Sequence, residues 1–319
     1  MPAPSAPTPA VSIGLPVYNG EAYLELAIRS AMEQSFEDFE LILADNASND
    51  GTSEICQEWA AKDQRVRWAR SEVHTGAAGN FNRAFSLARG NYFRWAAHDD
   101  LTEPTYLERC VERLRADHEL VLVHSEMTEI DEQGREIRKL GWPMKDANHP
   151  DKIRRFAGAI DLQHGCYDVF GLIRRDALAK TKLIAPYLGS DRVLLAELAL
   201  QGRMERVDET LFHSREHPQR SIRMRSESAR EQWFASGRPN AKFRPNWRRL
   251  AAVREAVSRA ELSLAERLRA QGEIARWAMK QRGSLYREVL DRARPDDINE
   301  KLPPPETIGE AAASGSKAG

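Results

Sequence analysis

Two adjacent carboxylates, Asp99 and Asp100, follow an apolar segment, Tyr92–Ala97, that has the pattern of a buried strand. Side chains at the carboxyl end of a strand lie where open α/β sheets bind their ligands. Neighbouring carboxylates repel each other unless a cation or a proton lies between them. A divalent cation that holds a phosphorylated substrate would explain the pair. The alternative interpretation is a solvated acidic turn that leads into the helix after Pro104.

Two other polar segments also follow apolar strand patterns. Pro16–Asn19 ends the first apolar segment, and Asp45–Thr52 follows the second. Carboxyl ends of neighbouring parallel strands line one crevice of a doubly wound sheet. These two segments and His98–Asp100 are therefore expected to converge in space, where they would form a single ligand site.

The elements that must position these residues alternate along the amino-terminal half. Short apolar segments alternating with stretches of helical spacing predict parallel strands, with helices on both faces of the sheet and right-handed connections. The expected strands are Val11–Val17, Phe39–Ala44, Val66–Ala69, Tyr92–Ala97, Leu120–His124 and Val169–Ile173, with a turn around Glu132–Gly134. The expected helices are Glu21–Glu33, one from Thr52, Gly79–Ala88, Thr105–Ala116, Asp191–Gln201 and several after Trp247.

Composition excludes several classes of protein. The 319 residues carry a formal net charge of −1, which implies no bulk attraction to nucleic acid or membranes. Three widely spaced cysteines signal neither a zinc site nor a disulfide framework, and they suit a reducing cytosol. The first residues lack the features of a signal peptide, and no apolar run is long enough to span a bilayer.

The order of the motifs resembles that of family 2 glycosyltransferases with a GT-A fold. The matching motifs are Pro16-Val17-Tyr18-Asn19, Asp45-Asn46-Ala47-Ser48-Asn49-Asp50-Gly51-Thr52, Gly76-x5-Asn82 and Asp99-Asp100-x3-Pro104, and the resemblance covers roughly residues 10 to 220. It implies a Rossmann-like, mostly parallel sheet flanked by helices. It also implies transfer of a sugar from a nucleotide-diphosphate donor to a hydroxyl acceptor, with inversion at the anomeric carbon and a bound divalent metal, Mn²⁺ or Mg²⁺.

The resemblance assigns donor-binding roles in the first three motifs. Asp45 would accept a hydrogen bond from the base, and a carboxylate, being acceptor-only, suits the ring N–H of a uracil or thymine; a UDP- or dTDP-sugar is therefore favoured. Phe81 stands where the family has a diphosphate-contacting arginine, and Arg83 is a candidate substitute. The alternative for Tyr18 is a packing aromatic, and for Asn82 an exposed helix residue. The full set of expected donor contacts is Pro16, Val17, Tyr18, Glu21, Asp45, Asn46, Gly76, Asn82 and His98.

The resemblance also assigns the metal and the base. Asp99 matches the metal ligand, while Ala97 replaces the first carboxylate of the family's metal motif, and His98 or Asp100 could compensate. His217 matches a further metal ligand or diphosphate contact, with a surface histidine as the alternative. Asp191 matches the catalytic base that removes the acceptor proton, with a helix-capping role as the alternative.

The carboxyl-terminal part is basic and contains three tryptophans. Fifteen Lys/Arg and six Asp/Glu lie between Arg238 and Arg294. Such helices can contact anionic lipid or form a packed extension with a solvated basic face. Nucleic-acid binding is not expected, because no recognised module accompanies the charge. We therefore expect a cytoplasmic protein, with peripheral contact at the inner face of the membrane as an option.

The expected organisation is a disordered tail over residues 1–9, a GT-A domain over 10–225, a helical extension over 226–300 and a disordered tail over 301–319. Two rival functions are a catalytically weak sugar-nucleotide-binding or scaffold protein, suggested by Ala97, and a nucleotidyltransferase. The second would need a Gly-rich loop followed by Arg or Lys near the amino terminus, and Pro16–Glu21 offers none.

Overall fold

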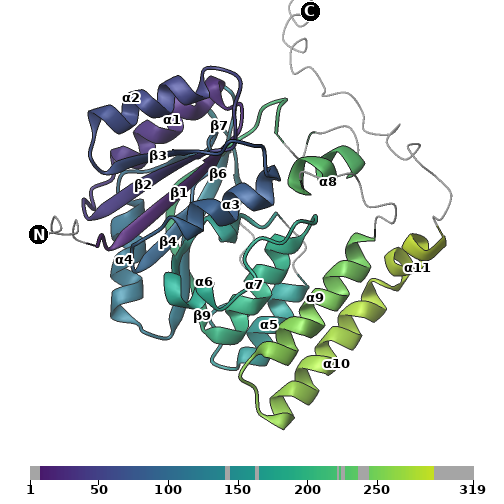
Figure 1. Ribbon diagram of the computed structural model, residues 1–319. Coiled ribbons are helices and arrows are strands. Elements are labelled where there is room, and N and C mark those ends of the chain that lie inside the picture. Colours follow the sequence, from purple (N-terminus) through teal and green to yellow (C-terminus); the bar gives the residue numbers. More distant parts are fainter. Residues whose placement is uncertain are drawn as a thin grey trace, which may run out of the picture.

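A computed structural model describes residues 8–140, 144–161, 165–220, 223, 227–235 and 244–290. The predicted tails fall almost entirely outside the described residues, as do the last ten residues of the predicted helical extension. Figure 1 shows one curved sheet with helices on both of its faces.

The amino-terminal half of the sheet is parallel, as predicted. Its four strands lie in the spatial order β3, β2, β1, β4, and every neighbouring pair runs in the same direction. The strands that follow β1 lie on one side of it as β2 and β3 and on the other side as β4, so the strand order reverses at β1. Open α/β sheets bind their ligands beside such a reversal, at the carboxyl ends of the strands. The strands are β1 (Val11–Val17), β2 (Phe39–Asp45), β3 (Val66–Arg70) and β4 (Tyr92–Trp95).

The second half of the sheet is mixed. Strand β8 runs antiparallel to both β4 and β6, so β6 again points in the direction of β4. Strand β9 is parallel to β6 and antiparallel to the short β5, and β7 forms a hairpin with β6. The bounds are β5 (Leu101–Thr102), β6 (Leu120–Ile130), β7 (Glu136–Leu140), β8 (Leu172–Arg174) and β9 (Arg203–Arg215).

Two sequence predictions change in this half. The segment from Val169 is a 3₁₀ turn, η1 (Tyr167–Phe170), and the strand starts only at Leu172. Gly171 separates them, and an added Cβ there would lie 2.9 Å from the carbonyl oxygen of Val123, which leaves room for glycine alone. The strand predicted to end at His124 continues to Ile130 because it pairs along this length with β9.

Helices cover the two faces with separate apolar cores. On one face, α1, α2 and α4 pack around Leu24, Ile28, Cys56 and Leu107. On the other face, α3, α5 and α7 pack around Trp95 and the buried leucines of α7. The bounds are α1 (Glu21–Met32), α2 (Thr52–Lys62), α3 (Gly76–Ser86), α4 (Tyr106–Ala116), α5 (Lys152–Ile160), α6 (Arg175–Ala179) and α7 (Ser190–Gln201).

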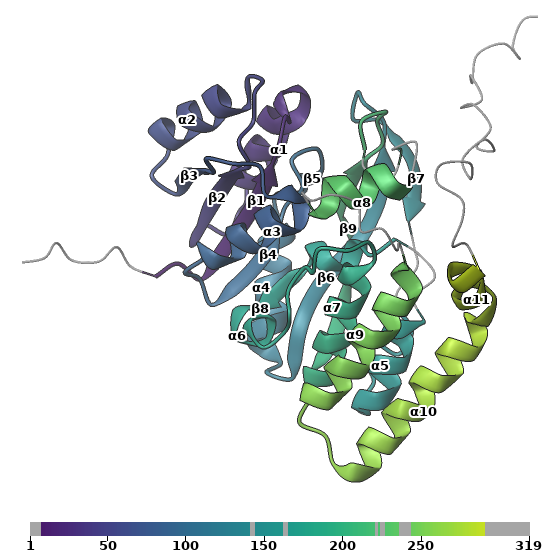
Figure 2. The ribbon, with the colours of Figure 1, turned by 45° about the vertical axis from the view of Figure 1, so that its right-hand side comes forward.

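Helices α9 and α10 form an outer layer over α7 and α5 (Figure 2), α11 packs against α9 and α10, and α8 contacts α3. Val257 on α9 and Ile274 and Trp277 on α10 are buried in the same core as α7. A reciprocal capping box between Ser263 and Glu266 begins α10. The helical part thus continues the core of the α/β part. The bounds are α8 (Glu227–Ala235), α9 (Pro245–Arg259), α10 (Leu264–Lys280) and α11 (Arg282–Leu290).

Candidate functional site

The loops after β1 and β2 are joined by hydrogen bonds at the carboxyl edge of the sheet. The backbone N–H of Gly20 donates to Thr52 Oγ1 at 2.9 Å, and that of Asn19 donates to Ser48 Oγ at 3.0 Å. Asn19 and Ala47 both have positive φ, a conformation that ordinary residues adopt only where the surroundings enforce it. The two loops therefore hold each other in one defined shape.

Two carboxylates from these loops exchange contacts with each other's helix. Asp50 Oδ2 accepts from the N–H of Glu21 at the start of α1, at 3.2 Å, while Glu21 Oε2 accepts from the N–H of Gly51 at the start of α2, at 2.7 Å. Negative charge at a helix amino terminus is favourable on both sides. Glu21, an expected donor contact, connects the two loops in this structure through its hydrogen bond with Gly51.

The loop after β4 lies against the loop after β1. A Cβ added to Gly20 would lie 2.6 Å from Cδ2 of His98 and 2.7 Å from Cγ2 of Val17. Only glycine lets the imidazole approach so closely. His98 therefore connects the third polar segment to the other two, and all three meet at one edge of the sheet.

Asp45 is the most enclosed of the expected donor-binding residues. Its carboxylate has no exposed surface and accepts from Ser48 N at 2.9 Å, Ser53 Oγ at 2.6 Å and Arg70 Nη1 at 3.0 Å. Burial alone would raise the pKa of Asp45, but these donors and the Arg70 charge lower it below its usual value. Asp45 therefore stays ionised. Arg70, at the end of β3, lies in no motif, which is why the sequence did not single it out.

The remaining expected donor residues on the loops after β1 and β2 and before α3 differ in exposure and in role. Tyr18 is 37 % exposed and its ring lies 4.3 Å from that of His74, so the pair forms an aromatic surface beside the β1 loop. Asn46 fixes the turn before α3: its Oδ1 accepts from Thr75 N at 2.9 Å and its Nδ2 donates to Gly76 O at 3.1 Å. Gly76 takes a φ of 74° there, which favours glycine. Pro16 and Val17 are buried and form the last residues of β1.

The helix after Gly76 directs its polar side chains away from the edge loops. Asn82 exchanges two hydrogen bonds with the backbone of Ile184, at 2.9 and 3.0 Å. The guanidinium of Arg83 donates to the carbonyls of Ala69 and Arg70 at 2.9 and 3.0 Å, at the end of β3. Its role as a substitute for the missing arginine stays a prediction. Asn80, which the sequence did not single out, bridges the ends of β1 and β2 through Val17 O and Ala44 O.

Asp99 and His217, far apart in the chain, meet in the structure. Their Oδ2 and Nε2 atoms are 2.8 Å apart, and the two side chains are only 15 % and 4 % exposed. The imidazole also lies 4.8 Å from the ring of Tyr23, measured between centroids. Burial alone would raise the pKa of Asp99, but His98 and the hydrogen bond to His217 lower it to about 2. Burial acts to lower the pKa of His217, and the bond to Asp99 outweighs it and raises that pKa.

Asp100 faces the protein interior instead. Its Oδ1 accepts from the backbone N–H of Arg215 at 2.8 Å. Burial and the charge of Asp99 raise the pKa of Asp100 to about 7. Arg215 is itself 1 % exposed, and its guanidinium donates to the carbonyls of Asp99, Asp131 and Glu132 at 3.0 Å each. Arg215 thus anchors the carboxylate loop to the tip of the β6–β7 hairpin.

The chemistry of the Asp99–His217 pair fits a divalent cation. One carboxylate oxygen, Asp99 Oδ2, and one imidazole nitrogen, His217 Nε2, lie side by side at 2.8 Å, and these two would be the ligands that the protein offers to an ion. Mixed oxygen and nitrogen ligands suit Mn²⁺. Among the described residues, no group of three or more His, Cys, Asp or Glu is arranged to hold a metal. The protein would therefore supply two ligands, with substrate oxygens and water completing the shell.

Asp191 lies in the first turn of α7, where Gly189 precedes it with a φ of 85°. Its Oδ1 accepts from the N–H of Arg192 at 2.9 Å. Burial raises the pKa of the Cys166 thiol, and the neighbouring Asp191 carboxylate raises it further. The N-cap position belongs to Gly189, so Asp191 is not the capping residue proposed as its alternative role.

Comparison with known proteins places this chain in a family. Residues 12–181, more than half of the chain, match the family described as Glycosyl transferase family 2. The chain is 35 % identical over 137 residues to the chondroitin synthase of Escherichia coli, covering 43 % of this chain and 20 % of that protein. It is also 35 % identical over 104 residues to the putative teichuronic acid biosynthesis glycosyltransferase TuaG of Bacillus subtilis, covering 33 % of this chain and 41 % of that protein.

Solved structures share the fold at lower identity. TarS 1-349 of S. aureus in complex with UDP superposes with a TM-score of 0.61 and 16 % identity, over 86 % of this chain and 72 % of that one. The mannosyltransferase PcManGT of Pyrobaculum calidifontis, in complex with GDP-Man and Mn²⁺, gives a TM-score of 0.51 and 19 % identity, over 89 % and 85 %.

The chain spans about a fifth to about half of the length of the first curated relatives that it matches. The fold class predicted from the sequence, a helix-flanked α/β sheet with a helical carboxyl-terminal part, is confirmed by the structure and by its likeness to these glycosyltransferases. The family predicted from the motifs is confirmed as well: this chain belongs to glycosyl transferase family 2.

Proposed function

We propose that this protein is a metal-dependent inverting glycosyltransferase that moves a sugar from a nucleotide diphosphate to a hydroxyl acceptor. The observation that carries the proposal is the contact between Asp99 and His217 at the edge where the three polar loops meet. A carboxylate and an imidazole that hold a divalent cation at this edge would suit a diphosphate leaving group. The relatives and structural neighbours, which include a synthase of chondroitin and a UDP complex, support the same reaction class.

The donor nucleotide would lie across the loops after β1 and β2. The Tyr18–His74 ring pair offers a surface on which a base can stack. Asp45, kept ionised, would accept from a base N–H, although three protein donors already occupy its oxygens. A UDP- or dTDP-sugar is our preferred donor. UDP and UDP-GlcNAc are bound by TarS and GDP-Man by PcManGT.

Asp99 and His217 would hold a divalent cation, Mn²⁺ or Mg²⁺, and a bound cation would offset the negative charge on the departing diphosphate. In a single displacement, the acceptor oxygen attacks C1 of the sugar while the C1–O bond to the diphosphate breaks. Asp191 takes the proton from that oxygen. The backbone of the joined loops, already fixed before substrate arrives, would hold the donor in the orientation for attack.

A screen of nucleotide sugars tests this function. Thermal unfolding with each donor, with and without Mn²⁺, identifies the donor by the rise in melting temperature. Release of nucleoside diphosphate is then measured with Mn²⁺ and with EDTA. Metal-stimulated release that Asp99→Asn abolishes supports the transferase. Binding without release would favour the scaffold alternative, and a covalent nucleotidyl product would favour the nucleotidyltransferase.

Acceptors in surface polysaccharide, glycolipid or natural-product glycosylation fit this reaction. We assign the donor and acceptor chemistry to the unit over residues 10–225 and a supporting role to the helical unit over 226–300. We place the protein in the cytoplasm, where the buried thiols of Cys56 and Cys110 would stay reduced.

The outer face of α10 supports peripheral contact with an anionic membrane. Leu264, Leu268 and Met279 lie on one side of this helix and are 74 %, 65 % and 67 % exposed. Residues 244–290 contain eleven Lys/Arg and five Asp/Glu, so the helical layer carries positive charge. Apolar side chains beside basic ones suit an interfacial helix. No helix of the described chain is long and apolar enough to cross a membrane.

Co-sedimentation with vesicles tests this contact. The wild-type protein is expected to bind phosphatidylglycerol vesicles and not phosphatidylcholine vesicles, and the double substitution Leu264→Ser, Leu268→Ser is expected to abolish binding. Equal recovery of both proteins with the anionic vesicles would rule out this surface.

A further inference from the structure

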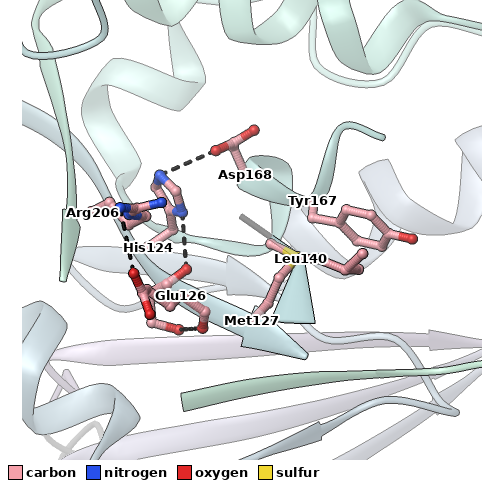
Figure 3. Close-up of a pocket in the computed structure, with 8 residues that line it drawn as sticks. His124, Glu126, Met127, Leu140, Tyr167, Asp168 and Arg206 are labelled. Atoms are coloured by element: carbon pink, nitrogen blue, oxygen red, sulfur yellow. Dashed lines mark hydrogen bonds and ion pairs between the residues drawn. The ribbon is translucent and has the colours of Figure 1, made fainter. Parts of the chain in front are cut away.

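A small pocket lies at the carboxyl-terminal part of β6, separate from the donor loops (Figure 3). Residues of β6, β7, η1 and β9 line it, and its volume is about 20 Å³, enough for about one water-sized group. Because β6 runs in the same direction as β4, this part of β6 lies toward the edge of the sheet that carries Asp99. The pocket therefore belongs to the ligand-binding side of the fold.

A buried ion pair forms the polar wall of the pocket. His124 Nε2 lies 3.1 Å from Asp168 Oδ1, and the two side chains are 10 % and 4 % exposed. The other ring nitrogen, Nδ1, lies 3.2 Å from the carbonyl oxygen of Ser125. An N–H on Nε2 can donate to Asp168 Oδ1. His124 therefore fixes the orientation of the Asp168 carboxylate.

The second oxygen of this carboxylate is unused. Asp168 Oδ2 is buried and has no hydrogen-bond partner among the described residues. A buried carboxylate oxygen without a donor is costly, and Asp168 lines the pocket, so a hydroxyl group that enters the pocket and reaches this oxygen would satisfy it. Across the pocket, Met127, Leu140 and the ring of Tyr167 provide an apolar wall. A hydroxyl group attached to carbon suits this pocket, because the hydroxyl can donate to the carboxylate on the polar side while the carbon atoms contact the apolar side.

The pocket is linked to the proposed reaction centre through η1. Tyr167, which lines the pocket, accepts from Arg220 Nη2 at 3.3 Å. Arg220 in turn pairs at 2.7 Å with Glu216, the residue before His217. On the other side, η1 contacts α7, and Cys166 lies near Asp191. Through these contacts, η1 connects the pocket both to the segment that carries His217 and to the start of α7, where Asp191 lies.

We propose that Asp168, held by His124, binds one hydroxyl group of a saccharide acceptor. This inference rests on the proposed glycosyltransferase function and adds the chemical class of the acceptor. The bound hydroxyl is not the attacking one: it donates to Asp168 Oδ2 and thereby positions its neighbour on the sugar ring for attack. The small volume of the pocket limits recognition to a single hydroxyl or hydroxymethyl group.

The test compares transfer with donor hydrolysis in the full-length protein with Mn²⁺ and the donor identified by the screen. The acceptor probes are the methyl glycosides of glucose, galactose, mannose and N-acetylglucosamine, with 1-propanol as a non-sugar alcohol. The variants are Asp168→Ala and Asp168→Asn. Tyr106→Phe is the matched control, because the Tyr106 hydroxyl donates to Phe170 O of the same 3₁₀ turn, at 3.2 Å, but does not line the pocket.

At least one glycoside, and not 1-propanol, is expected to accept the sugar from the wild-type protein. Asp168→Ala is expected to raise the KM for that glycoside at least tenfold and Asp168→Asn by a smaller factor, with hydrolysis of the donor within twofold of wild type. Tyr106→Phe should behave as wild type. Unchanged KM in Asp168→Ala, equal loss of hydrolysis and transfer, or hydrolysis with no glycoside accepted would each overturn the inference. A wild-type protein that releases no nucleoside diphosphate would instead refute the proposed function itself.

Discussion

The Asp99–His217 pair predicts that metal-dependent donor binding strengthens as pH rises. The hydrogen bond that His217 donates to the Asp99 carboxylate raises the pKa of His217, so the imidazole keeps its proton to a higher pH than a free histidine does. A metal ion needs the neutral imidazole and therefore competes with that proton. Asp99, with a pKa of about 2, is ionised throughout the useful pH range and contributes no slope.

The size of the effect follows from counting protons. Below the pKa of His217, one proton must leave for each metal bound, so the apparent Kd falls tenfold, or about 1.4 kcal/mol, per pH unit. The pKa of Asp100 is about 7. If donor and metal binding also ionises Asp100, the dependence below pH 7 becomes about a hundredfold per unit. A plot of −log Kd against pH should thus have a slope between about one and two for the wild-type protein. His217→Gln should lower this slope by about one.

Calorimetry with Mn²⁺ and the nucleotide sugar between pH 5.5 and 8 measures this slope. A nucleotide sugar is a suitable ligand because its diphosphate is esterified at both ends and does not titrate near neutrality. Repeating each titration in buffers of different ionisation enthalpy counts the protons released. Asp100→Asn is the control that isolates the contribution of the second carboxylate. A His217→Gln variant with the full wild-type slope, or a wild type with none, would refute the metal role of His217.

Three further outcomes are expected. Asp191→Asn should lower kcat by roughly 10²–10⁴-fold, the usual worth of a general base, while the donor Kd stays within twofold; unchanged kcat with a lower melting temperature would make Asp191 structural. Asp45→Ala should weaken donor binding at least tenfold in calorimetry and cost about 1–3 kcal/mol in urea unfolding, because buried donors lose their acceptor. In the metal-free protein, Asp100 has a raised pKa, so the folded state binds more protons than the unfolded state and stability should fall as pH rises from about 4 to 7. Asp100→Asn should flatten that fall, by on the order of 4 kcal/mol at pH 8, and parallel unfolding curves for the two proteins would contradict it.

The sequence was sufficient to predict where the loops meet. Each of the three polar segments follows a strand, and the rule for parallel sheets puts such segments at one edge. The hydrogen bond from Gly20 to Thr52 and the approach of His98 to Gly20 follow from that rule. The parallel half of the sheet was predictable for the same reason, because alternation of strands and helices leaves few topologies.

The partners of individual side chains were not predictable. Asn82 lies in a recognisable motif, yet its amide is bound to the backbone of Ile184, 102 positions away, and no local pattern encodes that contact. His124 and Asp168 are 44 positions apart and pair only because η1 packs on β6. Arg215, at the end of β9, is buried because β9 brings its side chain beneath the carboxylate loop. Such contacts depend on tertiary packing rather than on spacing.

Ala97 would leave the proposed metal site with one carboxylate fewer than the family motif, and the surroundings of Asp99 and Asp100 bear on how such a site would work. Of the two carboxylates that remain, Asp100 has its Oδ1 on the backbone of Arg215 and a pKa near neutrality, so Asp99 supplies the stable negative charge. With His217 as a neutral partner, the protein would offer a divalent cation one negative charge. The diphosphate of the donor would have to supply the rest. The affinity of the protein for the metal alone should then be low, and the metal and the donor should bind cooperatively. The metal would therefore occupy the site only when the nucleotide sugar is bound.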